Sequence, residues 1–271
     1  MPAIGALARD ADPDRFLCAL FAPPGKREAI FALIAFDREL ARAGEVTSQP
    51  TLALIRLQWW REVVEAAAEG KPPRRHEVAE PLHRAIAAGE LDATELAALI
   101  DAREAETELP FPARGAFEAY LSGTGGGFLV TMGRCLGAPS GLLPSLLLAG
   151  ELFALARVLR HLPAWAVAGR CPLPEDLLAV AGASADAFDP NGAAVQALSA
   201  QLAAAALPQL AQCRATLANL PRAAVSAALP AVLARRDLRR LAAGRGTVAP
   251  GTGRGLGDRL AVTLAGLRGR V

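Results

Sequence analysis

The sequence predicts an all-α fold, built as a single bundle of helices. Alanine and leucine dominate the chain, whereas aromatic residues make up only 5% of it and β-branched residues are sparse. Apolar residues recur at helical spacing in successive blocks, and proline and glycine fall between those blocks. The connections are short, and 271 residues are enough to enclose a sizeable core, so we expect one compact domain.

The helices of the first half follow from this periodicity. The first ends at Pro23, and the second carries Ile30, Leu33 and Ile34 on one apolar face. The third begins after a cap at residues 48–50, where a proline opens the helical block. The segments that we predict to be helical are 12–22, 26–44, 51–70, 77–88, 92–106 and 113–121.

The second half continues the same pattern up to a change of composition near residue 244. Further helices are predicted beyond Gly123 and at 144–162, 193–217 and 221–243. The sequence GRCPLPEDLL, which follows the 144–162 helix, is predicted to form a turn. These segments complete a helical domain at residues 1–243. Residues 244–271 are expected to form a Gly/Pro hinge and a basic amphipathic C-terminal helix.

That C-terminal helix allows two interpretations. Four leucines recur at helical spacing among arginines: Leu256, Leu260, Leu264 and Leu267, with Arg254, Arg259, Arg268 and Arg270 around them. The favoured interpretation is a terminal helix docked on the bundle. The alternative is a helix that contacts an anionic membrane surface. The glycines and prolines of the hinge further predict that the tail is separable, so that deleting it would barely change the melting temperature.

Composition excludes several classes of function. Lysine and arginine number 29 against 27 aspartates and glutamates, which argues against nucleic acid as a partner. The four cysteines are far apart and are expected to be isolated buried thiols. The three histidines have no motif around them, and His76 and His83 lie in a charged stretch typical of a solvated surface.

Neither a secretory signal nor a membrane span is expected. The N-terminus carries acidic residues where a signal peptide needs an apolar region. The longest apolar stretch begins at Leu142 but contains Pro144, Glu151 and Arg157, so it falls short of the roughly 18 uninterrupted residues that a span needs. We therefore expect a cytoplasmic location, at most peripheral to the inner membrane.

Two local motifs have ordinary structural explanations. The sequence GTGGG at 123–127 lacks the lysine of a phosphate-binding loop, and no strand precedes it, so we expect its glycines to permit close helix packing. Trp59 and Trp60 are adjacent, so on a helix their side chains point about 100° apart. We expect core positions for both, and the alternative places one of them at a groove.

Four blocks of sequence, in order, resemble the squalene and phytoene synthases. They are FLCALFAPPGKREAIFALIAFDREL, which resembles the segment leading into the family's first aspartate motif, then IDARE, AYLSGTGGGFLVTMGRCLG and AGRCPLPEDLL, covering about residues 12–243. The resemblance implies the isoprenoid synthase fold, a helical bundle around a central cavity. It also implies two aspartate-rich helices on opposing walls, here 30–43 and 145–162, which in active members hold Mg²⁺ against the substrate diphosphate.

In this chain both aspartate motifs are degenerate. The first motif's positions fall on Ala41, Arg42 and Glu45, so one acid remains. The second falls within RVLRHLPAW, where the motif positions are occupied by Arg157, Arg160, His161, Ala164 and Trp165. Pro163 is expected to interrupt the helix there, and no acid lies between residues 152 and 174.

Nearby acids do not replace the lost ligands. Asp37 and Glu45 would lie about 12 Å apart along a helix, and Glu151 would lie roughly 15 Å from His161. We therefore expect no catalytic residues, no metal ligands and no cofactor; Mg²⁺ would be needed only if the protein were an active prenyltransferase.

The paired loss resembles one branch of the family, the squalene/phytoene-synthase-like assembly factors of respiratory complex I, whose short motifs AFDRELA and LRHLP match. Three hypotheses follow. The first is a catalytically silent protein that acts by binding, with a protein partner in a membrane complex. The second is a working prenyltransferase that joins two prenyl diphosphates. The third is a pocket that binds a prenyl or other anionic lipid without metal, through Arg38, Arg42, Arg157 and Arg160.

The residues favour the first hypothesis over the third, and the third over the second. Arg42 has an equally good explanation as the partner of Glu39 or Glu45 on the helix surface.

Overall fold

The computed structural model describes residues 3–45 and 49–271. In its N-terminal half the helices are α1 Ala3–Ala11, α2 Pro13–Ala19, α3 Arg27–Glu45, α4 Pro50–Ala68, α5 Ala79–Ala87, α6 Ala93–Glu104 and α7 Arg114–Leu121. The C-terminal half contributes α8 Gly127–Cys135, α9 Leu143–Arg160, α10 Leu162–Val167, α11 Glu175–Ala181, α12 Ala193–Leu217, α13 Val225–Ala228, α14 Pro230–Ala242 and α15 Leu256–Arg268. The described residues contain no strand, which confirms the all-α prediction.

Local sequence explains where these helices begin. The Asp12 side chain caps α2 by accepting from the backbone N–H of Arg15, and the Asp92 side chain caps α6 through Thr94 and Glu95. Pro50 opens α4 in its first turn, where a missing N–H is harmless. The predicted cap at 48–50 includes Ser48, which lies outside the described residues.

The predicted elements differ from the observed ones in four places, one of which is the short helix α10, where no helix is predicted. Residues 3–11 form α1, which packs along α3, although no helix is predicted there. The turn GRCPLPEDLL contains the start of α11, because Pro174 precedes a short apolar run. The predicted 221–243 helix is divided into α13 and α14, with Pro230 in the first turn of α14.

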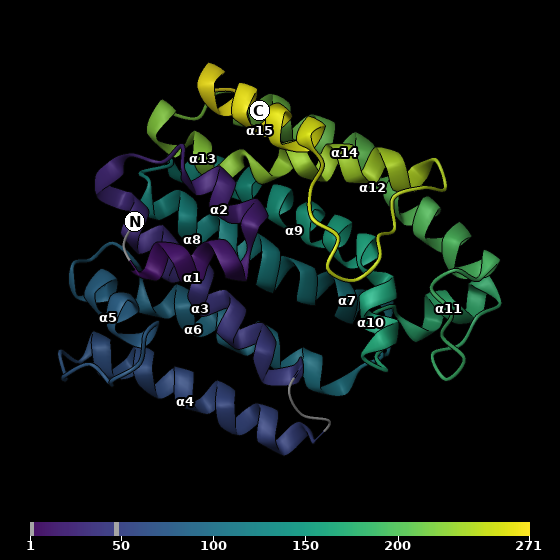
Figure 1. Ribbon diagram of the computed structural model, residues 1–271, viewed down its shortest axis with the longest axis horizontal. Coiled ribbons are helices and arrows are strands. Elements are labelled where there is room, and N and C mark those ends of the chain that lie inside the picture. The colour runs from purple at the N-terminus through teal and green to yellow at the C-terminus, as the bar shows by residue number, and fades with distance from the viewer. Residues whose placement is uncertain (1–2, 46–48) are drawn as a thin grey trace.

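The helices stack in layers (Figure 1). From one edge of the molecule to the other the order runs from α4 through α3 and α9 to α14 and α15. Helix α9 lies at the centre and packs against α8, α12 and α14, with Leu146, Phe153 and Leu159 fully buried. The cysteines are free and buried, as predicted.

One helix in the described part of the chain, Ser140–Arg160, is long and apolar enough by length and composition to cross a membrane. Its mean hydropathy is 1.8, although Pro144, Glu151 and Arg157 interrupt the apolar run as the sequence shows. More than half of its apolar window, 56%, is buried inside the protein. Its apolar side chains therefore serve the core of the bundle.

The glycines of the GTGGG motif allow α9 to approach closely, as predicted. Gly123, Gly125 and Gly126 lie in a π-helical turn, Ser122–Gly126, that joins α7 to α8, and Gly127 is the first residue of α8. A Cβ on Gly125 would lie 2.5 Å from the carbonyl oxygen of Gly150, and a Cβ on Gly150 would collide with the backbone of Gly125. This contact explains the motif without any phosphate ligand.

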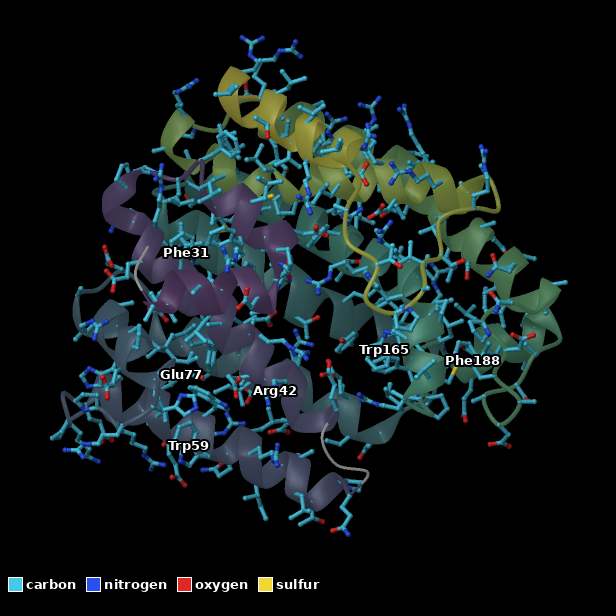
Figure 2. The ribbon with its side chains drawn as sticks, in the orientation of Figure 1. Phe31, Arg42, Trp59, Glu77, Trp165 and Phe188 are labelled. Atoms are coloured by element: carbon cyan, nitrogen blue, oxygen red, sulfur yellow. The ribbon has the colours of Figure 1, made fainter. Side chains whose placement is uncertain are left out.

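Side chains at the edge of the α4 layer correct one prediction. His76 is not a solvated residue: its ring packs edge-on against Trp59 and Trp60, with centroids 5.4 and 5.3 Å away. Trp60 is buried in the core, while Trp59 is half-buried beneath the guanidinium of Arg74 (Figure 2). His83 lies at the surface, where its Nε2 contacts the carbonyl of Lys71.

Candidate functional site

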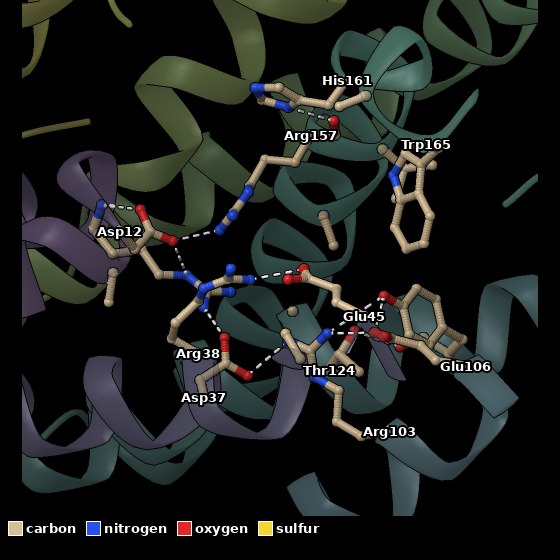
Figure 3. A pocket seen from close by; sticks show the side chains of 18 of the residues that line it. Asp12, Asp37, Arg38, Glu45, Arg103, Glu106, Thr124, Arg157, His161 and Trp165 are labelled. Atoms are coloured by element: carbon tan, nitrogen blue, oxygen red, sulfur yellow. Dashed lines mark hydrogen bonds and ion pairs between the residues drawn. The ribbon is translucent and has the colours of Figure 1, made fainter. Parts of the chain in front are cut away.

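A cavity of about 480 Å³ lies between α3 and α9 (Figure 3). Ile34, Asp37 and Ala41 contribute from α3, and Ala154 and Val158 contribute from α9. The sequence predicts these two helices on opposing walls of a central cavity, and the structure confirms it. Helices α6, α7 and α10 close the remaining sides with residues 103, 120, 164 and 165.

Most of the residues singled out from sequence line this cavity. They are Arg38, Ala41 and Glu45 from α3, Arg157 from α9, and His161, Ala164 and Trp165 at and after the end of α9. Helix α9 ends at Arg160 and α10 begins at Leu162, so the interruption expected from Pro163 is confirmed. Positions that the sequence assigns to both motifs, though not Arg42 or Arg160, thus face one space.

Two of the candidate arginines lie elsewhere. Arg42 is on the outer surface of α3, where it pairs with Glu39 at 2.9 Å. Arg160 is buried outside the cavity lining, and its guanidinium faces Asp237 of α14 at 3.4 Å. It lies three residues after Arg157, and its side chain is directed toward α14 instead of α3. Neither residue is therefore placed to hold an anion in the cavity.

Guanidinium groups engage the two aspartates on one side of the cavity. Asp37 accepts from Arg15 at 2.5 Å and from Arg103 at 2.8 Å, so both carboxylate oxygens are occupied. Asp12 accepts from the Arg157 guanidinium and from the backbone N–H of Arg15. Both aspartates are buried, which makes these pairs part of the interior of the protein.

The two glutamates of the lining are paired in the same way. Glu45 accepts from Arg38 at 2.7 Å. Glu106, in the turn after α6, accepts at one oxygen from Arg103 at 2.5 Å and from the Tyr120 hydroxyl at 2.7 Å. Arg170 donates to the Glu106 backbone carbonyl at 2.9 Å. The four carboxylates of the lining thus all have arginine partners.

The pairing shifts the protonation equilibria. Burial alone would raise the pKa of Asp37, but Arg103 and Arg15 outweigh burial and hold the pKa well below its ordinary value. Burial and the neighbouring Glu106 carboxylate raise the pKa of Tyr120 far above its ordinary value. Tyr120 therefore remains protonated and acts as a hydrogen-bond donor to Glu106.

The opposite wall carries no carboxylate. Burial lowers the pKa of His161, so the ring is neutral near pH 7, and its Nδ1 donates to the Arg157 carbonyl at 2.9 Å. Trp165 presents its ring to the cavity, and the Arg170 guanidinium lies 4.8 Å from the ring centroid. This wall offers an aromatic face and an imidazole, and Ala164 of α10 also lines it.

The residues present do not fit the Mg²⁺–diphosphate site of active family members. Magnesium takes oxygen ligands, mainly carboxylates and water. Each lining carboxylate is already neutralised by a guanidinium, and no group of three potential ligand side chains occurs within the described residues. A metal bound here would have to displace ion pairs, and in three of them the carboxylate, of Asp12, Asp37 or Glu106, is buried.

Sequence reasoning missed the arginine network itself. Arg15, Arg103, Glu106, Tyr120 and Arg170 were not identified as cavity residues. A usable signal was present, because Arg103 and Arg170 stand inside the blocks IDARE and AGRCPLPEDLL that carry the family resemblance. Asp12 and Arg15 gave no such signal, since only the tertiary packing of α2 brings them to the cavity.

Comparison with known proteins agrees with this geometry. A family model described as squalene/phytoene synthase matches residues 8–265. A solved dehydrosqualene synthase in complex with ligand has a TM-score of 0.79 at 14% identity, covering 98% of this chain and 94% of that one. The squalene synthase HpnC of Alicyclobacillus acidocaldarius gives 0.76 at 16% identity, covering 90% and 94%. Identities this low show the fold alone.

Two curated relatives are similar over part of the chain. One is NADH dehydrogenase (ubiquinone) complex I, assembly factor 6, of Homo sapiens, 36% identical over 98 residues, which are 36% of this chain and 29% of the relative. Its Mus musculus counterpart is 31% identical over 132 residues, 48% of this chain and 39% of the relative. The matched stretches therefore span well under half of the length of these relatives.

Proposed function

The chain belongs to the squalene/phytoene synthase family, and from that premise we propose that it is a non-catalytic member that acts by binding during assembly of a respiratory NADH dehydrogenase. One observation carries the non-catalytic part. Every carboxylate in the cavity lining is paired with an arginine, where active members need free carboxylates for Mg²⁺. The similarity to complex I assembly factor 6 supports the assembly role.

Loss of the metal ligands should remove the reaction and not merely slow it. Ionisation of a prenyl diphosphate leaves a pyrophosphate whose negative charge the metal ions neutralise as the bond breaks. Arg38 and Arg157 could attract a diphosphate, but they are already engaged by Glu45 and Asp12. The arginines of the cavity could therefore attract a diphosphate, but no metal ion would be held there to stabilise pyrophosphate as the leaving group.

The test is release of pyrophosphate from farnesyl and geranylgeranyl diphosphate in the presence of Mg²⁺ or Mn²⁺. We expect release at background, while a family member with intact aspartate motifs, assayed alongside, turns over. Metal-dependent product formation by this protein would overturn the proposal. The assembly role is tested separately: removing the protein from cells that contain it should lower the amount of assembled NADH dehydrogenase on native gels.

A second candidate function, binding of an anionic prenyl or lipid ligand without metal, is favoured by the position of Arg38. This side chain lines the cavity and is 39% exposed, so it can exchange Glu45 for a ligand phosphate. Calorimetry with farnesyl diphosphate in the absence of metal should detect binding that weakens with salt.

The chain offers a matched control for this measurement. Arg38→Gln should weaken binding of farnesyl diphosphate, whereas Arg42→Gln, on the same helix but outside the cavity, should not. Equal effects of the two substitutions, or no binding by the wild type, would argue against a ligand in the cavity.

A further inference from the structure

The outer face of α15 is an exposed apolar stripe. Its leucines are spaced so that they fall on one side of the helix, and their exposed fractions are 77% for Leu256, 59% for Leu260, 48% for Leu264 and 62% for Leu267. Few large apolar side chains elsewhere in the described residues are exposed to this degree. A contiguous stripe of this kind marks an interaction surface more often than a scattered exposed leucine does.

The inner face of the same helix is firmly docked. Val262 is fully buried, and Gly266 packs so closely on Phe21 that a Cβ would lie 2.5 Å from its ring. Asp258 accepts from Arg236 at 2.5 Å and from Arg240 at 2.7 Å. Docking fixes the rotation of α15, which lies at the outer edge of the molecule (Figure 1), and the exposed fractions show that its leucines face outward.

The surroundings of the stripe are strongly basic. Residues 193–271 hold eleven arginines and two aspartates, with no lysine or glutamate, whereas residues 1–192 hold 18 basic and 25 acidic side chains. Both aspartates of the C-terminal part, Asp237 and Asp258, are buried among guanidinium groups. Side chains that end in nitrogen atoms project from the edge of the molecule formed by α14 and α15 (Figure 2). The exposed charged side chains that residues 193–271 contribute are therefore all positive.

We propose that this face of α15 binds the surface of an anionic lipid bilayer. The four leucines would enter the boundary between headgroups and acyl chains, and Arg259, Arg268 and Arg270 would contact lipid phosphates. This combination of an apolar stripe and flanking cations supplies both contributions to interfacial affinity. A second copy of the chain is a poorer occupant, because a two-fold contact would bring the same arginines together.

The proposal does not rest on the function proposed for the cavity, since the face lies on another layer of the molecule. Failure of one therefore leaves the other standing. With this proposal both interpretations of residues 256–268 hold: the helix is docked on the bundle and still presents an interfacial surface.

Co-sedimentation of the full-length protein with lipid vesicles tests the proposal. Vesicles of phosphatidylcholine with phosphatidylglycerol should bind the protein, vesicles of phosphatidylcholine alone should bind it weakly, and added salt should release it. Leu260→Ser/Leu264→Ser should weaken binding by roughly tenfold or more, because two half-exposed leucines no longer insert. Arg259→Gln/Arg268→Gln/Arg270→Gln should weaken binding to the anionic vesicles by a similar factor.

The opposite edge of the molecule provides matched controls. Leu52 and Ile55 of α4 are 45% and 60% exposed, so Leu52→Ser/Ile55→Ser removes a comparable apolar surface elsewhere. Arg56→Gln/Arg75→Gln/Arg84→Gln removes the same charge from exposed positions. Both control variants should bind like the wild type. All substituted side chains are exposed, and thermal melts will confirm that every variant is folded.

Three outcomes would overturn the proposal. The first is absence of wild-type binding to anionic vesicles, a result that needs no variant. The second is an equal loss in the control variants. The third is an effect of Leu260→Ser/Leu264→Ser on self-association, measured by light scattering, or on capture of an acidic protein, with vesicle binding unchanged.

Discussion

At the scale of single residues, the buried Asp37 carboxylate holds two arginines from different helices. Arg15 is buried and Arg103 largely so, and both would lose a counter-charge if Asp37 became neutral. Removing one partner of a buried ion pair costs about 3–5 kcal/mol, because the remaining charge is left without compensation. Asp37 therefore has a structural role in this chain, joining α2, α3 and α6 at the cavity.

We predict that Asp37→Asn lowers the free energy of unfolding by about 3 kcal/mol or more, measured by urea denaturation. Glu39→Gln is the matched control on the same helix. Its partner Arg42 is half-exposed, so that substitution should cost about 1 kcal/mol or less. Equal and small effects of the two changes would show that the Asp37 network is not a stabilising element.

The same residue predicts a dependence on pH. The pKa of Asp37 is held well below its ordinary value, and the pKa of Asp12 is also lowered, because Arg157 and Arg15 outweigh its burial. Stability from such groups is complete above the unfolded pKa of about 3.9 and is lost as pH falls through the lower folded pKa. Asp14 has the opposite sign, since burial raises its pKa despite Arg254.

We therefore expect the wild type to lose stability progressively below a pH of about 4, measured by urea unfolding at a series of pH values. Asp37→Asn should show a shallower loss over the same range, because one of the titrating groups is gone. A loss of the same steepness in both proteins would assign acid sensitivity to other carboxylates.

At the scale of secondary structure elements, α9 depends on two glycines for its position. The backbones of Gly125 and Gly150 are in direct contact, and this contact lets α9 reach the wall of the cavity. Side chains larger than hydrogen would separate α9 from the π-helical turn between α7 and α8. The position of the second motif's helix is thus set by residues far from the motif.

We predict that Gly150→Ala lowers the melting temperature by several degrees, since overpacking in a close contact costs about 1–3 kcal/mol. Gly115→Ala, in α7, is the control. A Cβ there meets nothing within 4 Å, so helix propensity should make that change neutral or slightly stabilising. A neutral Gly150→Ala would mean that α9 can shift outward freely.

The contacts of residues 244–271 argue against the separable tail that their glycines and prolines predict. Arg254 is almost fully buried, donating to Asp14 of α2 at 2.8 Å and to Asp237 of α14 at 2.6 Å. The Val248 backbone N–H also donates to the Arg160 carbonyl at the end of α9. These contacts tie residues 244–271 to three helices of the body.

We predict that deletion of residues 254–271 lowers the melting temperature by several degrees, because Asp237 would lose its shortest ion pair and the Val262 contact would be exposed. Differential scanning calorimetry of the full-length and shortened proteins measures this. Coincident melting curves of the two proteins would show that the tail does not stabilise the body and is separable from it.

At the scale of the whole molecule, a net charge of +2 conceals two regions of opposite sign. The basic C-terminal part lies on the outer layers formed by α12, α14 and α15, and the acidic remainder forms the other layers (Figure 1). A charge distribution of this kind orients a protein before it makes contact with a charged surface. It would direct α15 toward an anionic membrane.

We predict stronger retention on a cation-exchange column at pH 7 than the net charge suggests. Arg259→Gln/Arg268→Gln/Arg270→Gln should elute at a clearly lower salt concentration than Arg56→Gln/Arg75→Gln/Arg84→Gln, although the two variants have the same net charge. Elution of both variants at the same salt concentration would show that retention depends on net charge alone and not on where the charges lie.

The sequence by itself determined the helical class, most helix positions and the family. Period, proline and glycine placement and capping are local properties, so α12 was predicted to the residue and α3, α4 and α9 nearly so. It also placed 30–43 and 145–162 on opposing walls, through motif order. Short or proline-divided helices such as α1, α11 and α13 were not predicted as separate elements, because each is too short for its apolar periodicity to be detected.

Only the tertiary structure decided which charges meet. Asp37 and Arg103 are 66 residues apart, and Asp12 and Arg157 are 145 apart, so no spacing rule could pair them. The same holds for Arg160, which is buried against Asp237 instead of lining the cavity, and for Arg254, which fastens the tail. Coulombic pairing depends on distance in space and on burial, and both arise only when the helices pack.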